Sequence, residues 1–186
     1  MNITKFEIPG LVLIEPKAFA DARGSFMETY HARRYAEAGI IRPFVQDNLS
    51  RSSERGVLRG LHSQVKHPQG KLIYVVRGEI WDVAVDIRRG SPTYGKWMGA
   101  TLSADNRQQL FVPEGCLHGY AVVSDGADVI YKCTDFYAPN DELGVIWNDP
   151  TFNIPWPVTS PKLSAKDEKL SPFSDAPADQ IPVFEG

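Results

Sequence analysis

The sequence predicts an all-β protein with a few short peripheral helices. Short apolar runs rich in β-branched residues recur along most of the chain, and glycine, proline and aspartate turn signals separate them. Only residues 31–38 combine good helix formers with a following glycine, Gly39, at the capping position. Many short strands at regular spacing are typical of a β-sandwich or β-barrel, and no internal repeat stands out.

The N-terminal quarter is expected to hold strands and one helix. Residues 11–15 form an apolar run that ends at a proline, and a turn at 21–24 precedes a second strand at 25–30. The helix at 31–38 follows. Residues 44–50 then predict a strand with a polar centre, whose amides and carboxylate can face solvent or read the edge of a heterocyclic base.

The middle of the chain carries the clearest strand patterns. Residues 57–64 and 72–76 are strand-like and flank a polar loop with a Pro-Gln-Gly turn signal. In residues 80–88, apolar and polar side chains alternate with the period of a strand. We expect Arg77–Glu79 to join this strand to the preceding one as a hairpin.

Four further strands are expected before the amino-acid composition changes at about residue 149. They cover residues 99–102, 109–112, 119–124 and one long strand at 128–137, with Asp125-Gly126 predicting a hairpin turn before the last. After residue 149, prolines, serines and aspartates dominate. Residues 160–186 read as an irregular tail in which Ser164 is the expected N-cap of a short helix, with Asp167 at its third position; this tail also carries Lys166.

Length and composition limit the possible functions. The 186 residues fit one domain over 1–186 with a substantial core. A net charge of −3 argues against nucleic acid as the main partner, and the longest early apolar run is too short to cross a membrane. Cys116 and Cys133 occur without a secretory signal, so we expect reduced, packed thiols in a cytoplasmic protein.

A basic cluster surrounds the histidine at residue 62. Between residues 51 and 71 the only acid is Glu54, against five basic residues, and His67 lies in the same span. Cations that can hold an anion, beside an imidazole that can transfer protons, indicate a site for an anionic small molecule. A solvated loop with one buried histidine is the alternative. The basic residues are Arg51, Arg55, Arg59, Lys66 and Lys71.

Residues 113–118, PEGCLH, have the spacing of the second metal-binding motif of cupin barrels. The first cupin motif, counted back from Gly78, places Lys71 where the metal-binding glutamate stands and leaves His67 and His118 as the only imidazoles. An ammonium group in that position repels a divalent cation, which needs three or four ligands. The sequence therefore predicts a cupin-type jelly-roll β-barrel without a metal and without another cofactor.

In these motifs and several others, the chain resembles the dTDP-4-dehydrorhamnose 3,5-epimerases, which are cupin-fold enzymes of dTDP-L-rhamnose biosynthesis. The resemblance extends from about Phe6 to Asp167. Where the usual motif has an aromatic residue after the catalytic histidine, this chain has Ser63. The motifs that carry the resemblance are GSFMET, FVQDN, GVLRGLH, GEIWDVAVDIR, SPTYGKW, VPEGCLHGY, YKCTDFY and LSAKD.

The resemblance implies the roles of the site residues. His62 would be the proton acceptor, oriented by Asp167; Tyr131 would be the proton donor on the opposite face of the sugar; and Lys71 would stabilise the enolate oxygen. Family members are homodimers in which N-terminal residues complete the partner's site. The substrate-binding residues that the resemblance implies are Arg23, Glu28, Gln46, Asp47, Asn48, Arg59, His118, Tyr137, Glu142 and Lys166.

These residue types suit the implied reaction, epimerisation of dTDP-4-dehydro-6-deoxy-D-glucose at C3 and C5 to dTDP-4-dehydro-L-rhamnose. Both carbons adjoin the C4 ketone, so their protons can be removed if the enolate is stabilised. A neutral imidazole is a suitable base near neutral pH. A cation at the developing oxyanion stabilises charge where it appears.

Each assignment has an alternative. Taken alone, Asp167 reads as a helix-start residue and Tyr131 as a half-buried strand tyrosine. Arg59 and His62 have opposite parity in a regular strand, so both can face one cavity only across a bulge, for which Gly60 is the candidate. The alternative functions are a mono-epimerase acting at C3 or C5 only, a metal-dependent cupin oxygenase, and a non-catalytic cupin that binds a nucleotide sugar.

Overall fold

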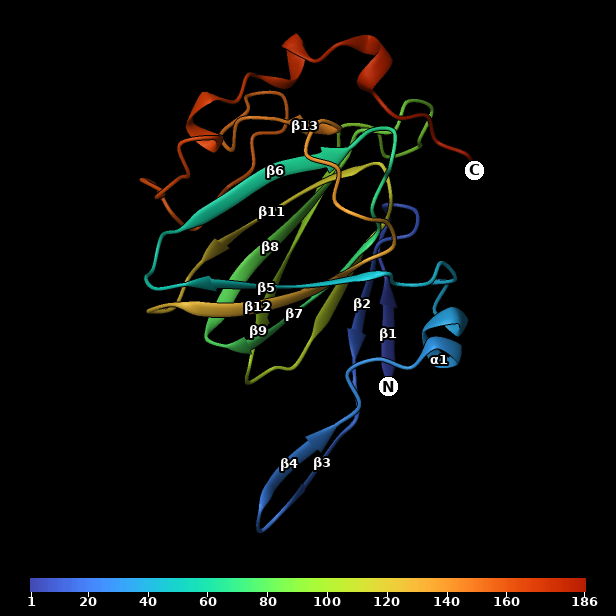
Figure 1. Cartoon of the computed structure of the whole chain (residues 1–186), viewed down its shortest axis with the longest axis vertical. Coiled ribbons are helices and arrows are strands. Elements are labelled where there is room, and N and C mark those ends of the chain that lie inside the picture. Colours follow the sequence, from blue (N-terminus) through green and yellow to red (C-terminus); the bar gives the residue numbers. More distant parts are fainter.

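Two antiparallel sheets make up the body of the structure, a computed structural model that describes residues 1–186 (Figure 1). The first sheet has six strands in the order β1-β2-β10-β7-β12-β5. Its strands are β1 (Asn2–Lys5), β2 (Val12–Glu15), β5 (Gln46–Ser52), β7 (Lys71–Arg77), β10 (Gln109–Val112) and β12 (Ala127–Cys133).

The second sheet has five strands in the order β13-β6-β11-β8-β9, and no strand belongs to both sheets. The only α-helix is a short one, so the prediction of an all-β protein with short peripheral helices is confirmed. The strands of this sheet are β6 (Leu58–Gln64), β8 (Glu79–Asp86), β9 (Trp97–Ser103), β11 (Cys116–Val122) and β13 (Glu142–Gly144).

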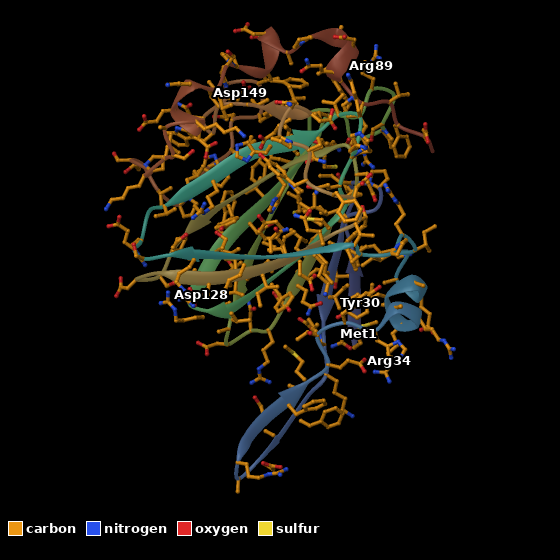
Figure 2. All side chains as sticks on the ribbon, viewed as in Figure 1. Met1, Tyr30, Arg34, Arg89, Asp128 and Asp149 are labelled. Atoms are coloured by element: carbon orange, nitrogen blue, oxygen red, sulfur yellow. The ribbon has the colours of Figure 1, made fainter.

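Apolar side chains from both sheets fill the space between them (Figure 2). Ile73 of β7 and Leu110 of β10 pack against Ile80 and Ala84 of β8, all of them fully buried. Burying a large apolar side chain stabilises a fold by roughly 1.5–3 kcal/mol relative to leaving it exposed. The core therefore holds the two sheets at a fixed spacing.

Different segments pack on the outer faces of the two sheets. Helix α1 (Ala32–Glu37), as predicted followed by Gly39 at φ +99°, packs Tyr35 on the outer face of the first sheet. The C-terminal region, which includes three 3-10 helices, lies over the second sheet, as Figure 1 shows at the top. Phe152 and Trp156 pack there against Val83 and Val85 of β8.

A two-stranded hairpin projects from the body of the molecule (Figure 1). It consists of β3 (Ala18–Asp21) and β4 (Gly24–Met27), joined at the turn that the sequence predicts. Phe19 and Phe26 on this hairpin are 56% and 70% exposed. Figure 2 shows Tyr30 and Arg34 where the chain passes from the hairpin into α1.

Several sequence-based expectations about the strands are wrong. The turns at Arg77–Glu79 and Asp125-Gly126 are not hairpins, because β7 and β12 lie in the first sheet whereas β8 and β11 lie in the second. Each turn carries the chain from one sheet to the other. The long strand expected at 128–137 ends at Cys133, where the Gly70 amide bonds to the Thr134 hydroxyl and the chain leaves the sheet.

Candidate active site

A cavity opens between the two sheets and is lined from both. It consists of two adjoining hollows of about 270 and 220 Å³ that share His62, Lys71 and Tyr131. His62 comes from β6 in the second sheet, whereas Lys71 and Tyr131 come from β7 and β12 in the first. The structure therefore brings all four predicted catalytic residues into one cavity, because Asp167 lines the second hollow together with the three shared residues.

A bulge in β6 allows Arg59 and His62 to face the same cavity. His118 pairs with His62 and Tyr120 pairs with Arg59, so the register of β6 against β11 shifts between them. Gly60 stands in this bulge at φ +108°, and a Cβ there would lie 2.6 Å from the Gly119 Cα. The prediction of a bulge at Gly60 is confirmed, and only glycine fits this close approach.

His62 is oriented by a buried carboxylate. Its Nε2 lies 2.7 Å from Oδ1 of Asp167, which the C-terminal tail places beside β6. Burial alone would raise the pKa of the Asp167 carboxyl, but the hydrogen bond with His62, the positive charge that His62 carries when it is protonated, and the hydrogen bond with Ser164 outweigh burial and lower that pKa. An ionised carboxylate can only accept, so Nε2 carries the hydrogen, and in the neutral imidazole Nδ1 is the nitrogen with a free lone pair.

The other nitrogen of His62 faces an ion pair at the edge of the cavity. Oε1 of Glu142, on β13, lies 3.6 Å from Nδ1, beyond hydrogen-bonding distance. The other oxygen of Glu142 accepts a hydrogen bond from Lys166. That hydrogen bond raises the pKa of the Lys166 ammonium. The free lone pair of His62 is thus directed toward the part of the site where two charged side chains meet.

Tyr131 and Lys71 approach the cavity from the sheet opposite His62. Burial raises the pKa of the Tyr131 phenol, and Cys133 adds to this rise, so the phenol is protonated at neutral pH. Burial lowers the pKa of the Lys71 ammonium, although Cys133 and Glu142 oppose the shift. A protonated phenol facing an imidazole, with a cation on the same side, is an arrangement for acid–base chemistry on both faces of a bound molecule.

One contact between a histidine and a buried carboxyl group was not expected from the sequence. Nε2 of His118 lies 2.9 and 3.0 Å from the two oxygens of Asp82, which is fully buried on β8. The alternation of residues 80–88 placed Asp82 opposite the apolar face, and that opposite face is the interior of the sandwich. A buried carboxylate requires such a partner, which is the signal that could have found this contact.

Amide side chains line the first hollow beside an exposed tyrosine. Oε1 of Gln46 accepts a hydrogen bond from the backbone N–H of Tyr137 at 2.9 Å, and Nε2 of Gln46 donates to Asn48. Gln46 and Asn48 alternate with Asp47 along β5, so only the two amides face the cavity. The structure therefore brings both amides together with Tyr137, and Gln64, which sequence reasoning missed, lines the same hollow.

Three predicted substrate-binding residues lie outside the cavity of this chain. Asp47 points away from it and binds Lys132 at 2.9 Å. Arg23 lies at the tip of the β3–β4 hairpin, where Asp21 holds it, and Glu28 binds Arg34 at 2.7 Å.

The basic cluster of the sequence is also divided. Arg59 and Lys71 line the cavity, whereas Arg51 binds Asp128 at 3.2 Å. His67 is exposed and lines neither hollow. No three His, Cys, Asp or Glu residues are grouped so that they could hold a metal ion, and no helix is both long and apolar enough to cross a membrane.

A histidine–aspartate pair, a facing tyrosine and a half-buried lysine line one cavity between two β-sheets, an arrangement typical of an acid–base enzyme. Comparisons with known proteins narrow this class. Residues 5–175 match the family model described as dTDP-4-dehydrorhamnose 3,5-epimerase. The chain belongs to this family.

The relatives agree with the family match. The chain is 51% identical to the dTDP-4-dehydrorhamnose 3,5-epimerase of Pseudomonas aeruginosa over 95% of this chain and 98% of that protein. It is 55% identical to the enzyme of that name from Neisseria gonorrhoeae, over 90% of this chain, but it spans only 51% of that longer protein. A solved dTDP-6-deoxy-D-glucose-3,5-epimerase from Legionella pneumophila, in complex with dTDP-4-keto-L-rhamnose, has a TM-score of 0.96 and 46% identity over 100% and 99% of the two chains.

Proposed function

We propose that this chain epimerises dTDP-4-dehydro-6-deoxy-D-glucose at C3 and C5, giving dTDP-4-dehydro-L-rhamnose for dTDP-L-rhamnose biosynthesis. Family membership and the complex of the Legionella pneumophila relative with dTDP-4-keto-L-rhamnose support this substrate. The observation that carries the proposal is the position of His62 and Tyr131 on facing walls of one cavity. Inverting a carbon requires a proton to leave one face and another to arrive on the opposite face.

Proton removal is assigned to Nδ1 of His62. Asp167 accepts the Nε2 hydrogen and so leaves Nδ1 as the basic atom. When Nδ1 takes a proton from C3 or C5, the imidazolium that forms lies beside the Asp167 carboxylate, which stabilises it. The Nδ1 atom faces Glu142 rather than the bulk of the protein, so the sugar ring would be bound along this edge.

Enolate stabilisation is assigned to Lys71 and proton return to Tyr131. The electrons of the broken C–H bond move onto the C4 oxygen, where the Lys71 ammonium would lie against the new charge. The Tyr131 phenol, protonated because burial raises its pKa, would then donate to the other face of the carbon. Solvent must finally return a proton to the phenolate and take one from the imidazolium before the next inversion.

Binding of the nucleotide is assigned to the rest of the cavity. Arg59 would hold the diphosphate, because a guanidinium ion forms strong charge-assisted hydrogen bonds with phosphate oxygens. Gln46 and Asn48 would contact the nucleotide, and Tyr137 would stack on the thymine ring. His118, Glu142 and Lys166 would complete the contacts with the substrate.

We further propose a homodimer in which the β3–β4 hairpin completes the partner's site. This arrangement would explain why Arg23 and Glu28, which the family resemblance assigns to the substrate, lie outside the cavity of their own chain. The Arg23 side chain is 90% exposed, and it shares a separate surface hollow with Phe19 and Phe26. Exposed aromatic side chains on a projecting hairpin favour burial against another chain.

The proposal also covers the fold, the domain organisation and the cellular location. We interpret the two sheets as a cupin-type jelly roll, and residues 1–186 as one domain whose tail, about 160–186, delivers Asp167 and Lys166 to the site. We also propose a cytoplasmic location, because Cys116 and Cys133 are free, buried thiols, the state expected in a reducing compartment. No metal or other cofactor takes part in the proposed chemistry.

A mono-epimerase acting at one carbon is the second candidate. A 3-epimerase from Streptomyces niveus is 43% identical over 95% of this chain, and Ser63, where the family motif usually has an aromatic residue, lines the cavity. Proton NMR of the 4-keto sugar nucleotide with enzyme in D₂O separates the candidates. Deuterium and inversion at both C3 and C5 would support the 3,5-epimerase. Inversion at one carbon would establish the mono-epimerase, and no exchange at either would refute both.

A further inference from the structure

The loop after β12 carries Tyr137, and a buried amide holds the backbone on both sides of that residue. Nε2 of Gln64 donates to the carbonyl oxygen of Phe136 at 3.1 Å, and Oε1 of Gln64 accepts from the N–H of Ala138 at 2.8 Å. Gln64 is 6% exposed. The amide therefore spans Tyr137 in the way that a neighbouring strand would pair with it.

The partners fix the orientation of this amide and use its full donor capacity. A backbone N–H can only donate and a carbonyl oxygen can only accept, so the Gln64 oxygen must face Ala138 and its nitrogen Phe136. The second N–H of Nε2 donates to the carbonyl oxygen of His67 at 2.7 Å. One side chain thus joins the loop of Tyr137 to the loop that follows β6.

Further side chains hold the same loop at its other backbone groups. Oε1 of Gln46 accepts from the N–H of Tyr137, and Nε2 of Gln69 donates to the carbonyl oxygen of Asp135 at 2.8 Å. The ring of Tyr137 itself lies at the cavity and is 54% exposed. Its position is consequently set through the backbone of residues 135–138 rather than by burial of the ring.

Gln64 also lies on the strand that carries the proposed base. His62 and Gln64 are two residues apart on β6, and both pair with β13, His62 opposite Gly144 and Gln64 opposite Glu142. Because side chains two residues apart in a strand share a face, β6 directs the imidazole and the amide to the same side. One rigid element therefore fixes the distance between His62 and the loop of Tyr137.

We infer that Gln64 is a positioning residue that holds Tyr137 as the wall for the nucleotide base and sets its distance from His62. The inference rests on the proposed function, because it assigns the base contact to Tyr137. Gln64 does not touch the reacting atoms in this scheme. It acts by presenting an exposed ring in one place, so that little ordering of the loop is required when the nucleotide binds.

The test is a double-mutant cycle with Gln64→Glu and Tyr137→Ala. At neutral pH the new carboxylate can still accept from Ala138 but repels the two carbonyl oxygens to which Gln64 donates. A loss of about 1.4 kcal/mol in binding free energy, within the range for one hydrogen bond, corresponds to a tenfold change in affinity. We expect KM for the sugar nucleotide and Kd for dTDP to rise roughly tenfold, with kcat little changed.

The decisive comparison is the effect of Gln64→Glu in the wild-type protein and in the Tyr137→Ala protein. In the Tyr137→Ala protein, Gln64→Glu should raise Kd for dTDP much less than in the wild type, because the ring it positions is gone. The Kd for pyrophosphate, which has no base, should stay unchanged. Asn140→Asp is the matched control, since it makes the same amide-to-carboxylate change at an exposed position of the same loop and should leave Kd unchanged. Equal effects of Gln64→Glu in both backgrounds would overturn the inference.

A pH series keeps the test informative if Gln64→Glu is poorly stable for turnover assays. Protonating the new carboxyl near pH 5 restores one donor toward the backbone carbonyl oxygens, so dTDP affinity should recover toward the wild-type value. No recovery, with the protein folded, would count against the role of the donor. Wild-type protein that does not convert the sugar nucleotide would refute the proposed function, whereas conversion without coupling between Gln64 and Tyr137 would refute only this inference.

Discussion

His62 and Tyr131 reach the same cavity from two different sheets, the imidazole from β6 and the phenol from β12. Neither strand pairs with the other, so the separation of the two groups depends on how the core spaces the sheets. A molecule bound between them would present one face to the imidazole and the other to the phenol.

The carboxylate of Asp167 predicts a pH dependence of stability. Its pKa is below the ordinary value of 3.8, so its stabilising contribution is complete above that value and is lost as pH falls through the lowered pKa. Asp167→Asn lacks this titration, and its free energy of unfolding should depend less steeply on pH in the acid range. Urea unfolding of both proteins between neutral pH and pH 3 measures this; parallel pH dependences would contradict it.

The lowered pKa of Lys71 predicts that activity begins to fall at a lower alkaline pH than it would with an ordinary lysine. Burial lowers the pKa of its ammonium below the ordinary 10.5, so the cation that we propose stabilises the enolate is lost at a lower pH than for an exposed lysine. The kcat/KM should fall as pH rises through this lowered pKa. Lys71→Gln should lose about 10²–10³-fold in turnover, the magnitude for one oxyanion-stabilising group. An alkaline limb that is retained unchanged in Lys71→Gln would belong to another residue.

Local patterns predicted the parts of the site that depend on a single strand. The alternation of β8 and the need for a bulge at Gly60 both follow from the period of a strand and from the absence of a Cβ in glycine. The Ser164 hydroxyl does accept a hydrogen bond from the Asp167 N–H at 3.1 Å, but the expected N-cap is wrong, because the 3-10 helix begins at Asp167 with Lys166 as its N-cap. These features need no knowledge of how distant segments pack.

The parts that sequence reasoning missed depend on contacts between distant segments. A turn signal such as Asp125-Gly126 is the same whether the next strand pairs with the last one or crosses to the other sheet. Gln64 has no local pattern that points to its partners, because Phe136 and Ala138 lie about seventy residues further along the chain. The alternation of residues 80–88 separates Asp82 from the apolar face, but it does not show that the other sheet buries the opposite face of β8 as well.

Arg59 should carry a large share of the affinity for the diphosphate. Hydrogen bonds to charged groups contribute about 1.5–3 kcal/mol, so Arg59→Ala should weaken dTDP binding by that amount. Arg51→Ala is the matched control, because Arg51 belongs to the same basic stretch but binds Asp128 outside the cavity. Calorimetry with dTDP compares the two variants. Equal losses in both would indicate a general charge effect rather than a contact of Arg59.

Prolonged chelation should leave turnover unchanged. The motivation is chemical: Lys71 projects an ammonium into the cavity where a metal-dependent cupin would carry a carboxylate ligand, and a cation there opposes metal binding. The measurement pairs metal analysis of the purified protein with activity before and after treatment with EDTA. Stoichiometric zinc, iron or nickel whose removal abolishes activity, and whose return restores it, would refute this prediction and favour the oxygenase alternative.

Replacing the base should abolish chemistry at both carbons. If Nδ1 of His62 removes the protons, His62→Ala should lose inversion and solvent exchange at C3 and C5 together. The expected loss is at least the ~10²–10⁴-fold that is typical of general acid–base catalysis. Binding of dTDP should persist, because His62 is not assigned to the nucleotide. Exchange of both protons at the wild-type rate in His62→Ala would mean that the proposed mechanism is wrong.

Replacing the acid should separate proton removal from inversion. Tyr131→Phe keeps His62, the proposed base, and Lys71, the proposed enolate-stabilising cation, so protons should still leave. At C5 the enolate would then often be reprotonated by His62 on the face from which the proton left. The expected signature is deuterium at C5 without matching inversion, in a protein that still binds dTDP. NMR of product configuration and deuterium content in D₂O measures both quantities, and inversion of C5 at the wild-type rate would show that Tyr131 only packs.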